Sequence, residues 1–164
     1  MVQRNPVASA ALYERDETAW LETTADLIRH GQLEAVDMAT LAEYLTDMAK
    51  RERREVFNRL VVLLSHLLKW EYQPDHRSGS WLGAILEQQR ELRQLLESSS
   101  LRNHAEAIFA DTYADARKQA AAETGISRGT FPKECPWDLA GVLADRGDES
   151  EPDAAASNGA DPRK

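Results

Sequence analysis

The chain has 164 residues, of which 42% are hydrophobic and 29% charged, and its formal net charge is −8 at pH 7. This length fits one domain with a hydrophobic core plus a possible tail. The negative charge argues against a general affinity of the whole molecule for nucleic acids or anionic membranes.

Its one cysteine, Cys135, excludes an internal disulfide and a cysteine-rich zinc site, and fits a reducing cytosol. The N-terminus lacks the apolar core of a signal peptide, and the apolar run Val56 to Leu68 is too short to span a bilayer. We therefore expect a cytoplasmic protein without membrane contact.

The N-terminal third of the chain predicts a flexible arm over residues 1–12 and then two helices. The first helix is expected from about Glu14 to Arg29, before Gly31. Asp37 is the expected N-cap of the second helix. The inward-facing residues of that second helix are expected to be Leu41, Leu45 and Met48.

A third helix is expected from roughly Arg51 to Tyr72, before the Gln73-Pro74 dipeptide. Nothing between Met48 and Glu52 forces a break, so one continuous helix and two separate helices both stay open at this point. The apolar run inside this segment predicts an element at the centre of the fold.

Later signals predict two further main helices and a short one. Ser80 is the expected N-cap of a fourth helix from Trp81 to Glu97, a serine among residues 98–100 caps the fifth, and Gly125 ends it. Asp138 can cap a last helix through Leu143. Because no segment has a β-strand period, we predict an all-α compact bundle of about five main helices, with a single domain over 13–144 and a disordered acidic tail over 145–164.

A polar seam follows the third helix, because helical spacing places Glu55, Arg59, His66, Lys69 and Gln73 on one face. One interpretation is a solvated edge on which Glu55 and Arg59 form a surface ion pair. The other is the wall of a cleft in which His66 acts as acid, base or ligand.

The turn after this helix has the ingredients of an anion site. Arg77 stands beside Ser78, Gly79 and Ser80, directly before a helix N-terminus whose free N–H groups favour a phosphate or a carboxylate. The alternative is local: Ser80 caps the helix, and Arg77 pairs with an acidic residue such as Glu87.

The sequence gives little support for a metal site or for a reactive cysteine. The fifth helix carries His104, Asp111 and Asp115, and Glu43, Asp47 or His66 could face them across a bundle. The Glu-x-x-His pairs of di-iron bundles are absent, so we expect no metal and no cofactor. Cys135 is expected to be a packed loop thiol, because no partner motif accompanies it.

The segment Lys50 to Arg54 is the one basic cluster of the chain, and a helix here could lie against phosphates. Residues 1–48 hold three basic and nine acidic side chains, so pairing within the protein is the favoured role of the cluster.

Many motifs occur in the order expected for one protein family, between about Tyr13 and Trp137. They are Tyr13-Glu14-Arg15-Asp16, Trp20-Leu21, Leu41-Ala42-Glu43, Glu52-Arg53-Arg54-Glu55, Leu60 to Pro74, Arg77-Ser78, Ser80-Trp81, Glu87-Gln88, Arg90, Tyr113, Ala116, Glu123-Thr124-Gly125 and Cys135-Pro136. On these residues the chain resembles a bacterial family of uncharacterised proteins, domain of unknown function number twenty-nine. The resemblance implies an α-helical fold and no assigned activity.

The resemblance also implies which polar residues recur in the family and where this chain departs from it. An acidic residue is expected where Tyr44 stands, and a glycine near Ala49, whose loss favours a continuous second and third helix. The recurrent polar residues correspond to Glu43, Arg54, His66, Lys69, Gln73, Arg77, Ser80, Glu87 and Arg90.

The leading hypothesis is a binding or regulatory helical module with an unknown protein partner. The first alternative is an enzyme for an anionic or phosphorylated substrate, in which His66 and Glu87 transfer protons. Its ligand-binding candidates are Lys69, Gln73, Arg77, Ser80 and Arg90. The second alternative is nucleic-acid binding through Lys50 to Arg59, which the net charge disfavours.

Overall fold

The computed structural model describes residues 10–144, and within this range it contains helices and no strand. The predicted all-α class is therefore confirmed. The expected acidic tail over 145–164 lies outside the described residues, as do residues 1–9. The chain divides into two compact units, Met1–Glu52 and Arg53–Lys164. None of the described helices is long and apolar enough to cross a membrane.

The first unit begins with two short helices, α1 (Ala10–Arg15) and α2 (Glu17–Arg29). The prediction of one helix from Glu14 is wrong at this point, because Asp16 takes an extended backbone conformation with a φ of −155°. Its carboxylate accepts a hydrogen bond from the backbone N–H of Ala19 at 2.9 Å, which makes it the N-cap of α2. Residues 10–12, expected in a flexible arm, belong to α1.

An aromatic cluster forms the core of the first unit. The rings of Tyr13, Trp20 and Tyr44 pack edge to face, with centroids 5.0 to 6.0 Å apart. Leu27 and Val36 are buried beside Trp20. Tyr44 stands where the family resemblance suggests a carboxylate, and its ring has taken a packing role here.

Helix α3 (Met38–Tyr72) is one continuous helix of 35 residues that runs from the first unit into the second. Asp37 caps it as predicted, since its carboxylate accepts hydrogen bonds from the N–H of Thr40 at 3.1 Å and from its hydroxyl at 2.9 Å. A short 3₁₀ turn, η1 (Leu33–Ala35), leads into it. Of the two alternatives that the sequence leaves open, the structure has the continuous helix.

The predicted inward stripe of the second helix is confirmed at Leu41 and wrong at Leu45 and Met48. Leu45 is 57% exposed and Met48 41% exposed, and Met38 at the start of α3 is 57% exposed. Leu41 and Tyr44 pack against the core of the first unit. Leu45 lies one turn after Leu41 and is exposed, so the edge of the buried side of α3 runs between these two residues.

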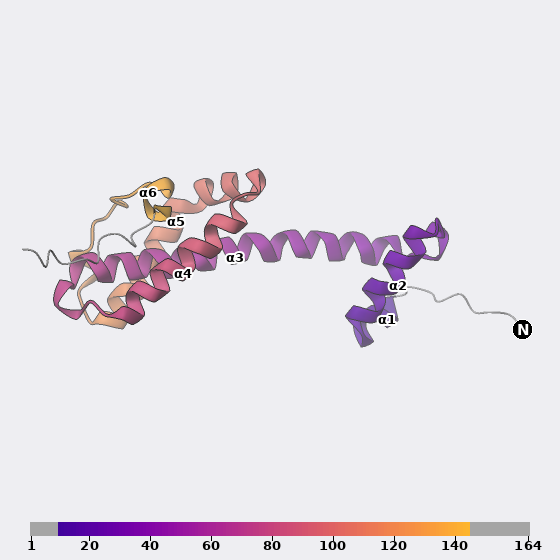
Figure 1. Ribbon diagram of the computed structural model, residues 1–164, viewed down its shortest axis with the longest axis horizontal. Coiled ribbons are helices and arrows are strands. Elements are labelled where there is room, and N and C mark those ends of the chain that lie inside the picture. Colours follow the sequence, from indigo (N-terminus) through magenta and orange to yellow (C-terminus); the bar gives the residue numbers. More distant parts are fainter. Residues whose placement is uncertain (1–9, 145–164) are drawn as a thin grey trace, which may run out of the picture. The chain divides into compact units, whose positions relative to one another are not determined.

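In the second unit, α4 (Gly79–Leu95) and α5 (Ser99–Thr124) lie alongside the C-terminal half of α3, and the short α6 (Leu139–Leu143) packs on both (Figure 1). Two 3₁₀ turns, η2 (Pro74–His76) and η3 (Arg128–Thr130), lie in the connections. The shared core consists of apolar residues from all four helices and from the loop after α5. They include Leu60, Leu63, Leu64, Leu67, Leu68, Ile85, Leu92, Tyr113, Phe131 and Val142.

The ends of these helices follow the predicted caps with one exception. Gly125 ends α5 with a left-handed φ of +72°, and the Asp138 carboxylate accepts from the N–H of Gly141 at 2.7 Å to cap α6. The N-cap of α4 is Ser78, which accepts from the N–H of Trp81, so the assignment to Ser80 is wrong. Both serines suit the role, and the extended backbone at Ser78 decides it.

The loop after α5 is held by polar contacts to the helices. The hydroxyl of Tyr113 donates to the carbonyl of Pro132 at 3.0 Å, and Arg117 donates to the carbonyl of Phe131 at 3.1 Å. The buried amide of Gln89 donates to the carbonyls of Val142 and Ala144 at 2.9 and 2.7 Å. These bonds fix the C-terminal segment against α4 and α5.

Candidate functional site

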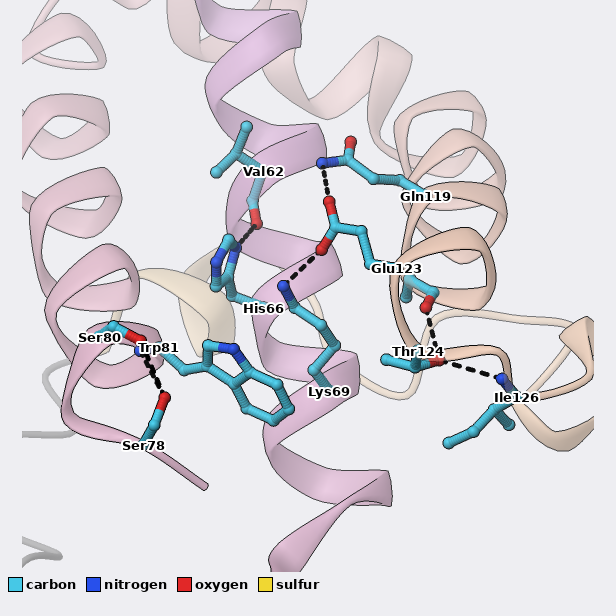
Figure 2. Close-up of polar contacts among 11 residues, drawn as sticks. Val62, His66, Lys69, Ser78, Ser80, Trp81, Gln119, Glu123, Thr124 and Ile126 are labelled. Atoms are coloured by element: carbon cyan, nitrogen blue, oxygen red, sulfur yellow. Dashed lines mark hydrogen bonds and ion pairs between the residues drawn. The ribbon is translucent and has the colours of Figure 1, made fainter. Parts of the chain in front are cut away.

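A buried lysine lies at the centre of the polar seam. The side chain of Lys69 is only 6% exposed, and its Nζ lies 2.5 Å from Oε2 of Glu123 on α5 (Figure 2). The ring of Trp81 on α4 lies beneath the ammonium group, with its centroid 5.1 Å away. A buried cation needs such partners, since desolvation of an unpaired charge is costly. Lys69 thus joins α3 to both neighbouring helices.

Glu123 is held from two sides. Its Oε1 accepts a hydrogen bond from the amide of Gln119 at 2.8 Å, while Lys69 occupies Oε2. Partial burial raises the pKa of this carboxyl, but the hydrogen bonds from Lys69 and Gln119 outweigh burial and hold the pKa below its usual value. Glu123 is therefore negative at neutral pH, as the cation beside it requires.

His66 lies one turn before Lys69 on α3, and its Nδ1 is 2.9 Å from the carbonyl oxygen of Val62. Because a carbonyl accepts only, Nδ1 carries the proton and Nε2 the free lone pair. Burial lowers the pKa of His66, and the charge of Lys69 lowers it further, against the opposite effects of Val62 and Glu123. The imidazole is therefore neutral at pH 7.

The opposite end of the seam is also internally paired. Nε of Arg59 lies 2.7 Å from the carboxylate of Glu55, which confirms the predicted ion pair. Arg59 also donates to the side chain of Gln88 on α4 at 3.1 Å and lies 3.8 Å from Glu91. Arg90 pairs with the same Glu91 at 2.5 Å. This part of the seam is an α3–α4 contact.

Arg77 is exposed and stacks on Trp70, with its guanidinium carbon 4.9 Å from the ring centroid. Its Nε donates to the Trp70 carbonyl at 2.9 Å. The hydroxyls of Ser78 and Ser80 lie 2.9 Å apart at the start of α4. Of the two predicted roles, pairing of Arg77 with Glu87 is not seen among the contacts of the described residues.

The remaining candidates are dispersed. Glu87 is exposed, and no hydrogen bond or ion pair within residues 10–144 joins it to His66. Gln73 is half-buried at the C-terminal end of α3, while Glu43 and Arg54 are exposed. The structure thus places His66 and Lys69 one turn apart on α3 and pairs Lys69 with Glu123, but it does not assemble the full candidate set.

Among the described residues, the structure supports neither a metal site nor a reactive cysteine. In the described part of the chain, no group of three or more His, Cys, Asp or Glu side chains could hold a metal ion, and Asp115 pairs with Lys118. The His104, Asp111 and Asp115 set is therefore not gathered with other ligands. Burial raises the pKa of the Cys135 thiol, which disfavours the thiolate.

A shallow groove of about 500 Å³ opens beside the Lys69–Glu123 pair, between α3 and α5. Its walls are partly apolar, and Gln119, which orients Glu123, is one of its lining residues. The others are Phe57, Asn58, Val61, Val62, Asp115 and Lys118. The groove could hold a side chain of a partner, but it presents no nucleophile with an activating base.

Sequence reasoning missed Glu123 and Gln119 as members of the site. The available signal was Glu123-Thr124-Gly125, which belongs to the motifs of the family resemblance but reads locally as a helix end. Spacing within α5 does not reveal that Glu123 meets a lysine 54 residues earlier in the chain.

A protein-family model matches most of the chain. The family model described as domain of unknown function DUF29 matches residues 12–146. No curated protein and no solved structure matches the chain.

The burial asymmetry of the Lys69–Glu123 pair predicts an asymmetric effect of mutation. Glu123→Gln leaves a buried ammonium without its counter-charge, and we expect it to lower the free energy of unfolding by about 3 kcal/mol. Lys69→Met keeps the apolar stem and leaves a carboxylate that is 40% exposed and can be hydrated, so we expect a loss of about 1 kcal/mol. Urea denaturation measures the free energy of unfolding of both variants. A larger loss for Lys69→Met than for Glu123→Gln would contradict the assignment of Lys69 as the buried member of the pair.

The lowered pKa of His66 predicts that the protein loses stability on mild acidification. The folded pKa of this histidine lies below the usual 6.5, so between the two values the unfolded chain binds more protons. The contribution of the neutral imidazole to the free energy of unfolding is complete above pH 6.5 and is lost as the pH falls through the folded pKa. Urea denaturation should show that the free energy of unfolding falls less for His66→Gln than for wild type between about pH 7.5 and about pH 5. His104→Gln is the control, and an unchanged decrease in His66→Gln would refute the prediction.

Proposed function

Because the chain belongs to the family of the domain of unknown function DUF29, whose description carries no activity, we propose its function from its own side chains: a binding or regulatory helical module. The lone Cys135 thiol fits a reducing compartment, so the proposal places it in the cytoplasm. The proposed partner is a protein, because the net charge of −8 disfavours binding of the whole molecule to nucleic acids and anionic membranes.

The pairing of the buried Lys69 with Glu123 is the observation that carries this proposal. A catalytic or anion-binding lysine needs a free ammonium group, whereas this one is enclosed by a carboxylate and an aromatic ring. Arg59 is likewise occupied by Glu55 and Gln88. The charges of the seam therefore serve the packing of helices, and recognition falls to another surface.

That surface is the outward face of the first half of α3. We name it the α3 stripe and define it by Met38, Leu41, Leu45 and Met48. Met38, Leu45 and Met48 are exposed, and Leu41 is half-buried at the edge of the stripe, where it also packs against the core of the first unit. Exposed apolar side chains that line one helix face are typical of contact sites for proteins.

The test is affinity capture of the tagged full chain from its native lysate, with nuclease present, and with two matched variants. Leu45→Lys places a charge in the α3 stripe, while Ile28→Lys does the same at a residue of α2 that is 44% exposed. We expect a stoichiometric partner in the capture by the wild-type chain. The amount of this partner should fall at least about tenfold with Leu45→Lys and stay the same with Ile28→Lys. Recovery of the wild-type chain without any partner or second copy would contradict the proposal.

One observation favours a second function, binding of an anionic ligand at the start of α4. Arg77 is held by Trp70 yet exposed, and it stands beside the serine hydroxyls at the N-terminus of a 17-residue helix. In the corresponding enzyme, His66 would supply the base through its free Nε2. Glu87 and Arg90 are exposed on the same helix α4 and could contact a bound substrate.

Inorganic phosphate tests this second function. If Arg77 binds an anion, phosphate should raise the melting temperature of the wild-type chain above that in an equal concentration of chloride, and Arg77→Ala should abolish the difference. Arg128→Ala, at an exposed arginine of η3, is the control for nonspecific charge effects. Equal stabilisation of Arg77→Ala and wild type would exclude the site.

Nucleic-acid binding through Lys50 to Arg59 has the least support. Lys50 pairs with Asp47 at 3.0 Å and Arg59 is committed to Glu55, so the cluster offers fewer free cations than the sequence suggests. The exposed Arg51, Arg53 and Arg54 remain. The nuclease in the capture experiment separates this function from protein binding.

A further inference from the structure

We propose that the α3 stripe binds the same stripe of a second copy of this chain, with the two helices antiparallel. The inference rests on the proposed function, since it names the partner of that surface.

The spacing of the α3 stripe suits a helix as its occupant. Its residues follow one another at intervals of three, four and three, which are the a and d positions of two heptads. The neighbouring Ala42 and Ala49 are exposed and small. Large apolar knobs beside small residues allow a second helix to approach closely and to fill the spaces between them.

The order of the residues makes the α3 stripe complementary to itself. Methionine, leucine, leucine and methionine read the same in both directions, with symmetric spacing about residue 43. A two-fold axis at this point would place Met38 of one copy against Met48 of the other, and Leu41 against Leu45. The contact is thus isologous, as every two-fold interface is, and a heterologous partner would not require this symmetry.

The charges at the two ends of the α3 stripe select the antiparallel orientation. Glu34 and Asp37 precede it, whereas Lys50 and Arg51 follow it. Antiparallel copies bring the acidic end of one stripe to the basic end of the other, and parallel copies bring like charges together. Arg51 is exposed and has no ion pair within the described residues.

The length of the α3 stripe limits the strength of this dimer. From Met38 to Met48 the helix rises about 15 Å, and Glu52 interrupts the apolar positions on the next turn. Such a contact is smaller than the roughly 1,200–2,000 Å² that stable complexes bury. The dimer is therefore expected to dissociate on dilution.

Sedimentation velocity of the full chain over a concentration series tests the association. Wild type should shift with concentration from 18.4 kDa toward twice that mass. Leu45→Lys should raise the dissociation constant at least about tenfold, and Ile28→Lys should leave it unchanged. A wild type that stays monomeric throughout, or an equal effect of both variants, would overturn the inference, and circular dichroism verifies that each variant is folded.

Disulfide formation tests the orientation in a Cys135→Ser background. A mixture of Met38→Cys and Met48→Cys chains should form covalent heterodimers under mild oxidation, because the antiparallel contact places these positions together. Met38→Cys alone should remain monomeric on a non-reducing gel. Efficient cross-linking of Met38→Cys with itself would establish a parallel pair and refute the proposed arrangement.

The two proposals can fail separately. A monomeric wild type that captures a different protein through the α3 stripe refutes the self-association and leaves the binding-module function intact. A wild type without self-association and without a captured partner refutes both.

Discussion

The packing of the second unit depends on a buried positive charge. Lys69 lies on the most apolar part of α3, and its ammonium is accommodated by Glu123 of α5 and the ring of Trp81 on α4. A misplaced α5 would leave the cation without a counter-charge, so the pair specifies the register between helices as well as their contact. The leucines around it supply most of the apolar burial but would tolerate more than one arrangement.

Helix α3 meets two environments along its length. Its C-terminal half is buried by α4, α5 and α6, whereas residues 38–48 bury one side against an aromatic cluster and expose the other. The charged stretch around Lys50 lies between these regions, and its side chains are exposed. The buried interior of the second unit and the exposed apolar residues thus occupy different turns of one helix.

Features that depend on neighbouring residues were predictable from the sequence. Asp37, Gly125 and Asp138 act as caps because capping involves only a few consecutive residues. The same rules failed where two residues competed for one role, as Ser78 and Ser80 do, or where Asp16 interrupts a pattern that suits one longer helix. The period of Leu41, Leu45 and Met48 revealed an apolar face, but it could not tell which side the core would cover.

The sequence by itself determined that the chain is all-helical and that an apolar segment with a polar seam lies at its centre. These conclusions need only helical periodicity and neighbours one turn apart. Only the tertiary structure decided that Lys69 is buried with Glu123, that Arg77 stacks on Trp70 rather than pairing with Glu87, and that Leu45 faces outward. Long-range pairing and burial depend on which helices meet, and no local pattern in one chain encodes that.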